Sequence, residues 1–525
     1  MGSSGVFEEK RLSEQVTSAL FWNTVTIPVI YLISFVSSIF VARFLGPDKF
    51  SIFGIVNSIL NSLMIYIDFG LVTGIIKFLP EAREGQNGLE EGILTLIVAA
   101  KAGLSILAAA LINVFSDFFA GIFNLGSDSK LFLAFVSILL LLSIIEDISN
   151  TILISEFKHK TSRLIYISSS ILLPLLNILV VVLGCGVRAL LLVMIIVGAY
   201  KAVLSVYYSN LWTKINFQQL KDFTANNFTL LKRYFEFCLS GYVIRFARYL
   251  WDISFMVLLA VLLGYNSAIP FLMIGYILVQ KITTLLYAPF DKMIPSIISR
   301  AALDKTTEEL NKYYDAVNKY IIIVYLPIGF LLYTIFPQII VMFYGAEYQS
   351  SVIYAQIFLI IFFLSTLASL GNTILFQYEK YKLIYISLFI SLLILLLVPI
   401  SKYVFFSIVP IVIIIGISKN LFHIFTCIQM HRIFKDVKYP TGFLLKVLSC
   451  SLPQMMLFVL FNNFFTQNIL GLLLYGLGYF MVFILMLVLT NPFSDKEKEY
   501  IKLKLIALSR KKKSVKIVAI TEVNE

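Results

Sequence analysis

The segment that decides the fold class is an apolar run with charge at its centre. Residues 235–263 read FEFCLSGYVIRFARYLWDISFMVLLAVLL, longer than the roughly 20 residues that a helix needs to cross a bilayer. Near its middle lie Arg245, Arg248 and Asp252, and their spacings of three and four place them on one face of a continuous helix. Charges at mid-membrane turn toward the protein interior and commonly mark a substrate or ion pathway. The alternative is a structural ion pair between Arg248 and Asp252, which leaves Arg245 unexplained.

Apolar segments of this length recur along almost the whole chain. Of its 525 residues, 59% are hydrophobic and only 14% are charged, and the mean hydropathy is +0.90. A soluble protein of this composition would lack the polar surface needed to cover its core. We therefore predict an all-α polytopic membrane protein with about 14 transmembrane helices. The expected spans are residues 22–45, 50–78, 92–115, 131–154, 164–183, 189–211, 235–263, 269–290, 320–343, 352–376, 383–400, 403–427, 442–465 and 469–489.

Polar stretches divide the chain between these spans. The predicted parts are a cytoplasmic N-terminal segment (1–21), an N-lobe of six spans (22–211), a cytoplasmic inter-lobe loop (212–234), a C-lobe of six spans (235–430), two extra C-terminal helices (441–490) and a basic cytoplasmic tail (491–525). The first segment carries acidic residues, so it is not a cleavable signal peptide. The tail is basic and amphipathic, which is typical of a segment that rests on anionic lipid headgroups.

The distribution of lysine and arginine predicts the orientation. With the amino terminus in the cytoplasm, most of the 42 Lys and Arg residues lie on the cytoplasmic side, as positively charged loops usually do. The predicted outer loops hold only Arg43, Lys49, Lys130, Arg188 and Lys402. We therefore expect a multi-pass protein of the cytoplasmic membrane with both termini in the cytoplasm.

The two groups of six spans are predicted to be copies of one unit. Asn-Thr-Ile-Leu occurs at 150–153 and again at 372–375, and Leu-Ile-Tyr-Ile-Ser at 164–168 and again at 383–387. Because six is an even number, both copies have the same orientation in the membrane, which makes a parallel repeat. Transporters built from such repeats place their substrate site between the halves. Positions about 220 residues before Arg245 and Arg248 are uncharged, so the arginines are an addition to one half.

Several charged residues fall inside the predicted spans. The lysines other than Lys77, which can snorkel to the membrane surface, lie near mid-depth and have no acidic residue within one helical turn. Each alone could be satisfied by a backbone carbonyl or by snorkelling. Together with the arginines they predict a water-filled, net positive cavity that suits an anionic ligand, with phosphate as the obvious group. The substrate-binding candidates are Arg245, Arg248, Lys281, Lys101, Lys201 and Lys419.

The acidic residues inside the spans are candidates for counter-charges or for a proton or sodium site. Glu146 and Asp147 are adjacent, so on a helix they point about 100° apart and cannot both line one path. The full set of these acids is Asp252, Asp68, Glu146 and Asp147.

Motifs of catalysis are absent from the sequence. There is no P-loop, GxGxxG, HExxH or GxSxG pattern, and the three histidines and four cysteines have no metal-ligand spacing. We expect a transporter without metal or cofactor, driven by an ion gradient or by the concentration difference of its substrate.

Three strings resemble a known family. VARFLGPDKFSIFGIVNSI (41–59), YIDFGLVTGIIKFLPEAREG (66–85) and FPQIIVMFYGAEYQSSVIYAQIFLI (336–360) are similar to polysaccharide biosynthesis proteins of the O-antigen-flippase-like branch of the multidrug/oligosaccharidyl-lipid/polysaccharide exporter superfamily. The resemblance implies two six-helix lobes in a V around a central cavity, with alternating access. It also implies a polyprenyl-pyrophosphate-linked sugar that crosses from the inner to the outer leaflet, its pyrophosphate held by basic cavity residues.

The expected function is that of a lipid-linked oligosaccharide flippase for cell-surface polysaccharide or glycan synthesis. Its expected partners are the polyprenyl-linked glycan, membrane lipids, H⁺ or Na⁺ as a coupling ion, and glycan-assembly enzymes, with no nucleic acid. An ion-coupled drug or cation exporter of the same superfamily is the alternative, but it calls for a negatively charged cavity. A membrane polymerase or glycosyltransferase acting on lipid-linked sugars is a third interpretation, and the short outer loops argue against it.

Overall fold

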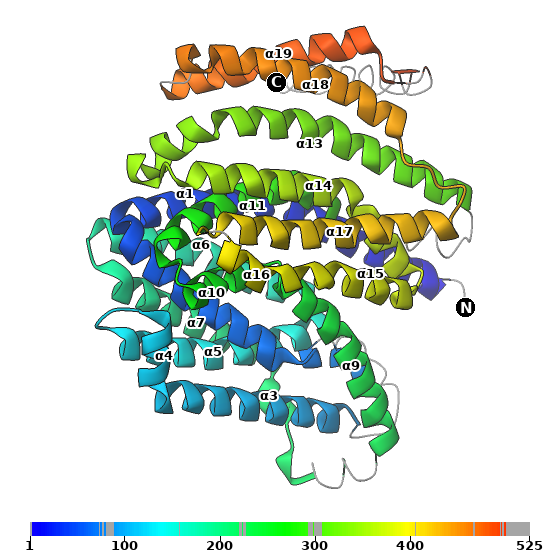
Figure 1. Ribbon diagram of the computed structural model, residues 1–525. Coiled ribbons are helices and arrows are strands. Elements are labelled where there is room, and N and C mark those ends of the chain that lie inside the picture. The colour runs from blue at the N-terminus through cyan, green and yellow to red at the C-terminus, as the bar shows by residue number, and fades with distance from the viewer. Residues whose placement is uncertain are drawn as a thin grey trace, which may run out of the picture. The chain divides into compact units, whose positions relative to one another are not determined.

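The computed structural model is helical throughout the part of the chain that it describes (Figure 1). The described residues are 3–72, 74–75, 78–79, 89–156, 158–219, 223, 227–291, 298, 307–404, 406–465, 468–493, 495 and 498–499. Within them, 12 helices are long and apolar enough to cross a membrane, or 13 if one bent pair counts as a span. The protein is therefore an all-helical, multi-pass membrane protein, as the sequence predicts. Lys77 and most of the predicted tail lie outside the described residues.

The described residues form two compact units. The first unit falls within Met1–Thr306 and Phe336–Lys435, and the second within Thr307–Ile335 and Asp436–Glu525. The helix α13 (Thr307–Tyr344) contributes to both. In the second unit, α18 (Thr441–Phe465) packs against α19 (Ile469–Thr490). The Phe458 ring there meets Tyr475 and Tyr479 edge-on, with both centroid separations at 5.1 Å.

The first two predicted spans form one long element, α1 (Ser3–Asp68), with a kink at Gly46. Gly46 has φ 71° and ψ 168°, a conformation that is essentially restricted to glycine. No atom lies within 4 Å of the position that a Cβ would take there, so the backbone and not crowding requires glycine. Pro47 follows, where its fixed φ suits the first turn of the second arm.

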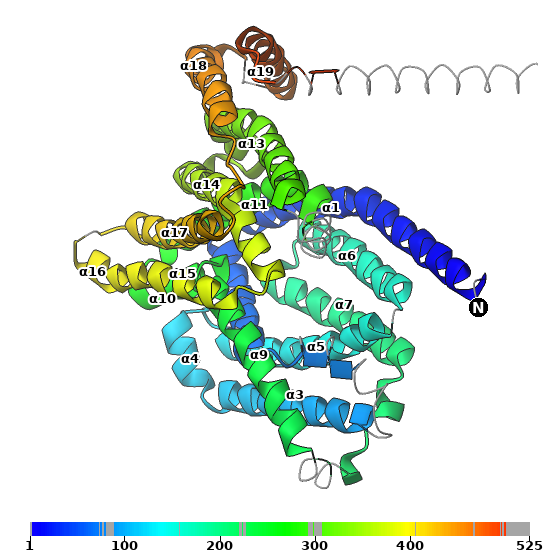
Figure 2. The same cartoon turned by 90° about the vertical axis from the view of Figure 1, so that its right-hand side faces the viewer.

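Four helices of the amino-terminal half lie side by side in Figure 2, in the order α3, α5, α7 and α6. Their bounds are Leu89–Val114 for α3, Ser129–Ser155 for α5, Gly186–Ser209 for α7 and His159–Val182 for α6. The short α4 (Ser116–Phe123) precedes α5, and η1 (Leu211–Lys214) and η2 (Phe217–Gln219) follow α7. Because α5 packs against both α3 and α7, side chains on two of its faces can reach two different helices.

The helices of the carboxyl-terminal half repeat this arrangement. Helix α14 (Ser351–Gln377) packs against α11 (Ile269–Asp291) and α17 (Val409–Ile433), and α15 (Tyr381–Leu393) also packs against α17. Ser351 and Tyr381 each lie 222 residues after the first residues of α5 and α6. The short elements between these helices are η3 (Asn266–Ala268), η4 (Ala346–Tyr348), η5 (Ile394–Leu396) and α16 (Leu397–Val404).

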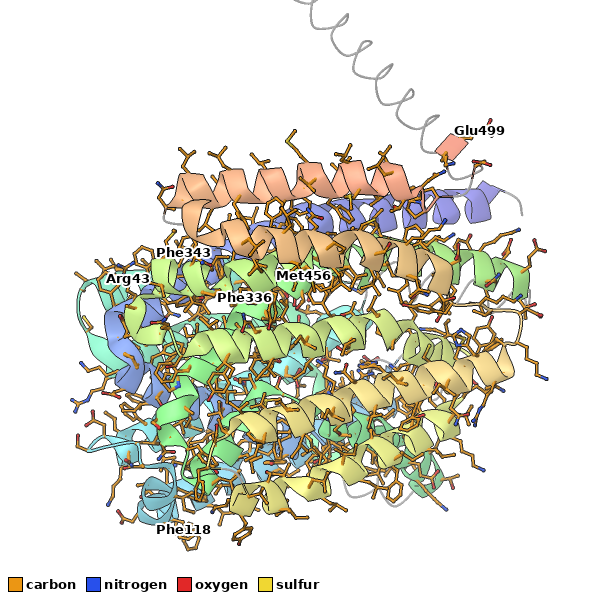
Figure 3. The ribbon with its side chains drawn as sticks, turned by 45° about the horizontal axis from the view of Figure 1, so that its top comes forward. Arg43, Phe118, Phe336, Phe343, Met456 and Glu499 are labelled. Carbon is orange, nitrogen blue, oxygen red and sulfur yellow. The ribbon has the colours of Figure 1, made fainter. Side chains whose placement is uncertain are left out.

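The helix ends repeat as closely as the helix starts. The Glu156 amide donates to the Ile152 carbonyl at the end of α5, and the Tyr378 amide donates to Ile374 at the end of α14. These pairs are also 222 residues apart, so the same turn closes both copies. In Figure 3, Arg43, Phe118 and Phe343 lie toward the same end of the first unit's helices, where the sequence predicts three outer segments.

The segment 235–263 is not the continuous helix that the sequence predicts. Helix α9 (Phe228–Tyr249) ends before α10 (Ile253–Leu263) begins, and the two are bent by 58°. Asp252 has an extended conformation, and its Oδ1 accepts a hydrogen bond from the Ser254 amide at 2.9 Å. Aspartate at this N-cap position satisfies the first amides of a new helix, which favours the break. Asp252 therefore does not share a helical face with Arg245 and Arg248, and the predicted common face is wrong for it.

Candidate functional site

A buried ion network lies among α1, α3 and α5. The Lys101 ammonium on α3 is 2.9 Å from Asp68 Oδ1 at the end of α1 and 2.9 Å from Asp147 Oδ2 on α5. The Lys101 side chain is only 2% exposed and that of Asp68 only 5%, whereas Asp147 is 38% exposed. A lysine buried this deeply needs paired and hydrogen-bonded partners, because desolvation of its charge is costly. Both partners come from other helices, so helical spacing along the sequence could not reveal them.

The adjacent acids on α5 point to different helices, as their sequence positions predict. Asp147 contacts Lys101 on α3, while Glu146 Oε1 lies 3.3 Å from the Lys201 ammonium on α7. The second pair is less buried, with Lys201 28% exposed and Glu146 21% exposed. The charges of Lys101 and Lys201 are therefore balanced by carboxylates within the protein.

Asp68 has a second cationic partner in the carboxyl-terminal half. The Arg245 guanidinium on α9 forms an ion pair with Asp68 Oδ2. Half of the Arg245 side chain is exposed (50%), in contrast to the buried Asp68. One carboxylate thus accepts from a buried lysine of one half and from an accessible arginine of the other.

A second polar cluster surrounds the break between α9 and α10. Arg248, one turn after Arg245 on α9, makes no ion pair or hydrogen bond with any other described residue. The predicted Arg248–Asp252 pair is not formed in the described part of the chain. Asp252 Oδ2 instead accepts from the Tyr276 hydroxyl on α11 at 3.5 Å, while Oδ1 caps α10. Arg248 is therefore left as an exposed cation beside the helix break.

Helix α17 contributes the other cation of this cluster. The Lys419 ammonium lies 3.9 Å from the centroid of the Phe362 ring and interacts electrostatically with Asp252. His423, one turn further along α17, interacts electrostatically with both Lys419 and Arg248. Its buried Nδ1 has no hydrogen-bond partner among the described residues. We name Arg248, Lys419 and His423 the basic cluster.

The remaining predicted cation faces the first arm of α1. The Lys281 ammonium on α11 donates to Ser34 Oγ at 2.6 Å and lies 5.3 Å from the centroid of the Tyr31 ring. The structure thus separates the six predicted cations into two groups. Lys101, Lys201 and Arg245 have carboxylate partners, whereas Arg248, Lys281 and Lys419 have none among the described residues.

Sequence reasoning missed the polar and aromatic neighbours of the basic cluster. His423 lies four residues after Lys419, a helical spacing that would have indicated a shared face. Tyr276 and Phe362 come from other helices and gave no comparable signal. Among the described residues, no group of three or more His, Cys, Asp or Glu side chains could hold a metal ion.

Comparisons with known proteins agree with this architecture. A family profile described as "Polysaccharide biosynthesis protein" matches residues 40–353. The fold is similar to that of a lipid II flippase, MurJ, in an inward closed conformation, with a TM-score of 0.69 and 15% sequence identity over 89% of this chain and 98% of that chain. It is also similar to an inward-facing multidrug resistance MATE family transporter, with a TM-score of 0.52 and 16% identity over 78% of this chain and 94% of that chain. No curated protein sequence matches this chain.

Proposed function

Because this chain belongs to the polysaccharide biosynthesis protein family, we propose that it is a flippase for polyprenyl-pyrophosphate-linked oligosaccharides. The substrate crosses from the inner to the outer leaflet of the cytoplasmic membrane by alternating access. The chain has about 14 spans, counting each arm of α1 and the broken α9–α10 span, and both termini are cytoplasmic. Two parallel six-helix repeats form the lobes, and they rock about a central cavity.

The observation that carries this proposal is the basic cluster at the break between α9 and α10. Arg248 is accessible and has no carboxylate partner among the described residues, Lys419 is held over an aromatic ring, and the buried His423 Nδ1 lacks a hydrogen-bond partner there. Pyrophosphate offers several anionic oxygens, so it can accept from a forked guanidinium and from an ammonium at once. We assign the pyrophosphate group to this cluster, with Lys281 as a further contact.

Lys101 and Lys201 have a different role in this proposal. Their charges are balanced by Asp68, Asp147 and Glu146, so an added anion would have to compete with carboxylates already in place. We propose that they shape the electrostatics of the amino-terminal half, and that a coupling proton or sodium ion, if one is used, acts on these acids.

The fold similarity to the MurJ flippase supports a lipid-linked substrate, and the weaker similarity to a multidrug MATE transporter keeps a drug exporter as the alternative. The charge balance separates the two. A cation exporter needs unbalanced acids, whereas in the described part of this chain Asp68, Asp147 and Glu146 all face cations, and the cations without carboxylate partners outnumber the unpaired Asp252.

The test uses the full-length protein in a strain that lacks its own gene. Polyprenyl-linked sugar should accumulate on the inner leaflet of that strain and disappear when the protein is restored. Arg248→Ala and Lys419→Ala should each abolish this rescue at unchanged abundance. Arg248→Lys should restore it partly, because the charge returns without the forked geometry. Lys402→Ala, in a predicted outer loop, is the matched control and should retain rescue.

One further variant distinguishes substrate binding from a structural ion pair. If Arg248 served only to balance Asp252, neutralising both residues would restore activity, because no orphaned charge would remain. We expect the double variant Arg248→Ala/Asp252→Asn to stay inactive. Recovery in that variant, or accumulation of cationic dyes in place of polyprenyl-linked sugar, would overturn the proposal.

A further inference from the structure

Helix α9 crosses the chain closely where α1 ends. After Asp68, Phe69 and Gly70 both have positive φ values, 44° and 72°, which break the helix. A Cβ on Gly70 would overlap the carbonyl oxygen of Cys238 on α9. A Cβ on Gly74 would lie 2.5 Å from the Tyr234 ring and 2.7 Å from Cys238 Sγ. Two glycines four residues apart thus let two backbones approach, as at close helix crossings in membranes.

Polar contacts and stacked rings hold this crossing together along α9. The Tyr234 hydroxyl donates to the Leu71 carbonyl at one end. Further along, the rings of Phe69 and Tyr242 stack with centroids 5.2 Å apart. The Arg245–Asp68 ion pair comes next. We name this set of contacts, between α9 and residues 68–74, the α9 seam.

The α9 seam joins the two halves of the internal repeat. Residues 68–74 belong to the predicted N-lobe, and α9 begins the predicted C-lobe. If the lobes rock, these contacts must separate. The predicted orientation places the start of α9 on the cytoplasmic side, so the closed seam bars the inner end of the path.

We propose that the Arg245–Asp68 ion pair is a latch on this seam, and that binding of the substrate's pyrophosphate releases it. The inference rests on the proposed function and adds a positioning role for two residues. Arg245 and Arg248 are three residues apart, so they share one face of α9. Arg245 is half exposed, so an anion held by Arg248 can reach its guanidinium and compete with Asp68 for it.

The buried lysine makes release of the latch feasible. Without Arg245, Asp68 would be a buried, unpaired carboxylate, which is strongly unfavourable. Lys101 remains 2.9 Å from Asp68 and also contacts Asp147, so the carboxylate stays paired when the arginine leaves. The arrangement therefore gives Arg245 two alternative anionic partners, and it gives Asp68 a permanent cation. The latch opens by an exchange of partners that leaves no buried charge unpaired.

A native cysteine supplies the reporter for the test. In a disulfide with an S–S length of about 2.04 Å, each Cβ lies about 3 Å from the partner sulfur. The position of a Cβ on residue 74 is 2.7 Å from Cys238 Sγ, so Gly74→Cys should crosslink to Cys238 when the seam is closed. The other cysteines are replaced by serine, and a protease site in the 212–234 loop reveals the disulfide as two joined fragments.

The experiment measures the oxidative crosslinking rate in the purified full-length protein, with inorganic pyrophosphate as the probe. Pyrophosphate should slow crosslinking about fivefold or more, a typical coupling between two sites. Arg245→Gln should crosslink slowly with and without pyrophosphate, and Arg245→Lys should recover part of the response. Arg188→Gln, whose partner Asp128 lies far along the sequence, is the control and should respond like the parent.

Binding of pyrophosphate is measured in parallel to separate the two ideas. Binding that depends on Arg248 but leaves the crosslinking rate unchanged overturns the latch and leaves the proposed function standing. Absence of any binding overturns both. If Gly74→Cys does not fold, the pair Phe69→Cys and Tyr242→Cys replaces it, since these rings are already stacked across the seam. A crosslinking rate in that pair that does not change with bound pyrophosphate likewise overturns the latch.

Discussion

Replacing Lys101 by methionine removes the shared partner of Asp68 and Asp147. Breaking a buried ion pair costs about 3–5 kcal/mol, because it leaves a desolvated charge behind. Asp68 keeps Arg245 and Asp147 is partly exposed, so the lower end of that range applies, about 3 kcal/mol. At an unfolding entropy of about 2 cal/mol/K per residue, a chain of 525 residues loses roughly 3 °C in Tm for this change.

The assay is thermal unfolding of the purified protein, followed by its retention on size-exclusion chromatography. The matched control is Lys201→Met, which breaks a longer, more exposed pair with Glu146 and should cost only about 1 kcal/mol. Adding Asp68→Asn to Lys101→Met should recover about 2 kcal/mol, because the buried carboxylate is then neutral.

Three results would refute this reasoning. Equal losses of stability in Lys101→Met and Lys201→Met would mean that burial does not set the magnitude. No recovery in the Lys101→Met/Asp68→Asn double variant would mean that Lys101 acts by packing alone. Unchanged stability with lost transport would favour the original prediction that Lys101 binds the substrate.

Three further predictions concern the predicted outer end of the helices. The Arg188 guanidinium lowers the pKa of Asp128, so their contact is complete above the usual value and is lost as pH falls through the lowered one; Arg188→Gln should move that loss to higher pH, seen as labelling of a cysteine placed in the 124–128 loop. Gly46→Ala should destabilise by about 1–3 kcal/mol through backbone strain alone, measured as a lower Tm, and an unchanged Tm would mean that the kink relaxes. Cysteines near Pro47 and Tyr265 should crosslink only in the inward-open state and stop transport, and continued transport by the crosslinked protein would contradict rocking of the halves.

Much of the architecture could be predicted because it follows from local chain properties. Apolar length sets a membrane helix, and an Asn-Thr-Ile-Leu string repeated after 222 residues corresponds to helices α5 and α14 that start and end in step. The divergence of Glu146 and Asp147 followed from helix geometry alone. The break at Asp252 had a local cause as well, an N-cap, but the surrounding apolar residues concealed it.

The pairing of charges could not be predicted in this way. The partners of Lys101 lie 33 and 46 residues away, and Arg245 reaches Asp68 across 177 residues, so only packing of separate helices brings them together. The sequence by itself determined that the chain spans a membrane as helices, that its halves are related, and that it keeps more basic than acidic groups inside. Only the tertiary structure decided which bases are neutralised and which stay available to an anion, because helix periodicity fixes neighbours within about one turn, whereas an ion pair requires contact between side chains on different helices.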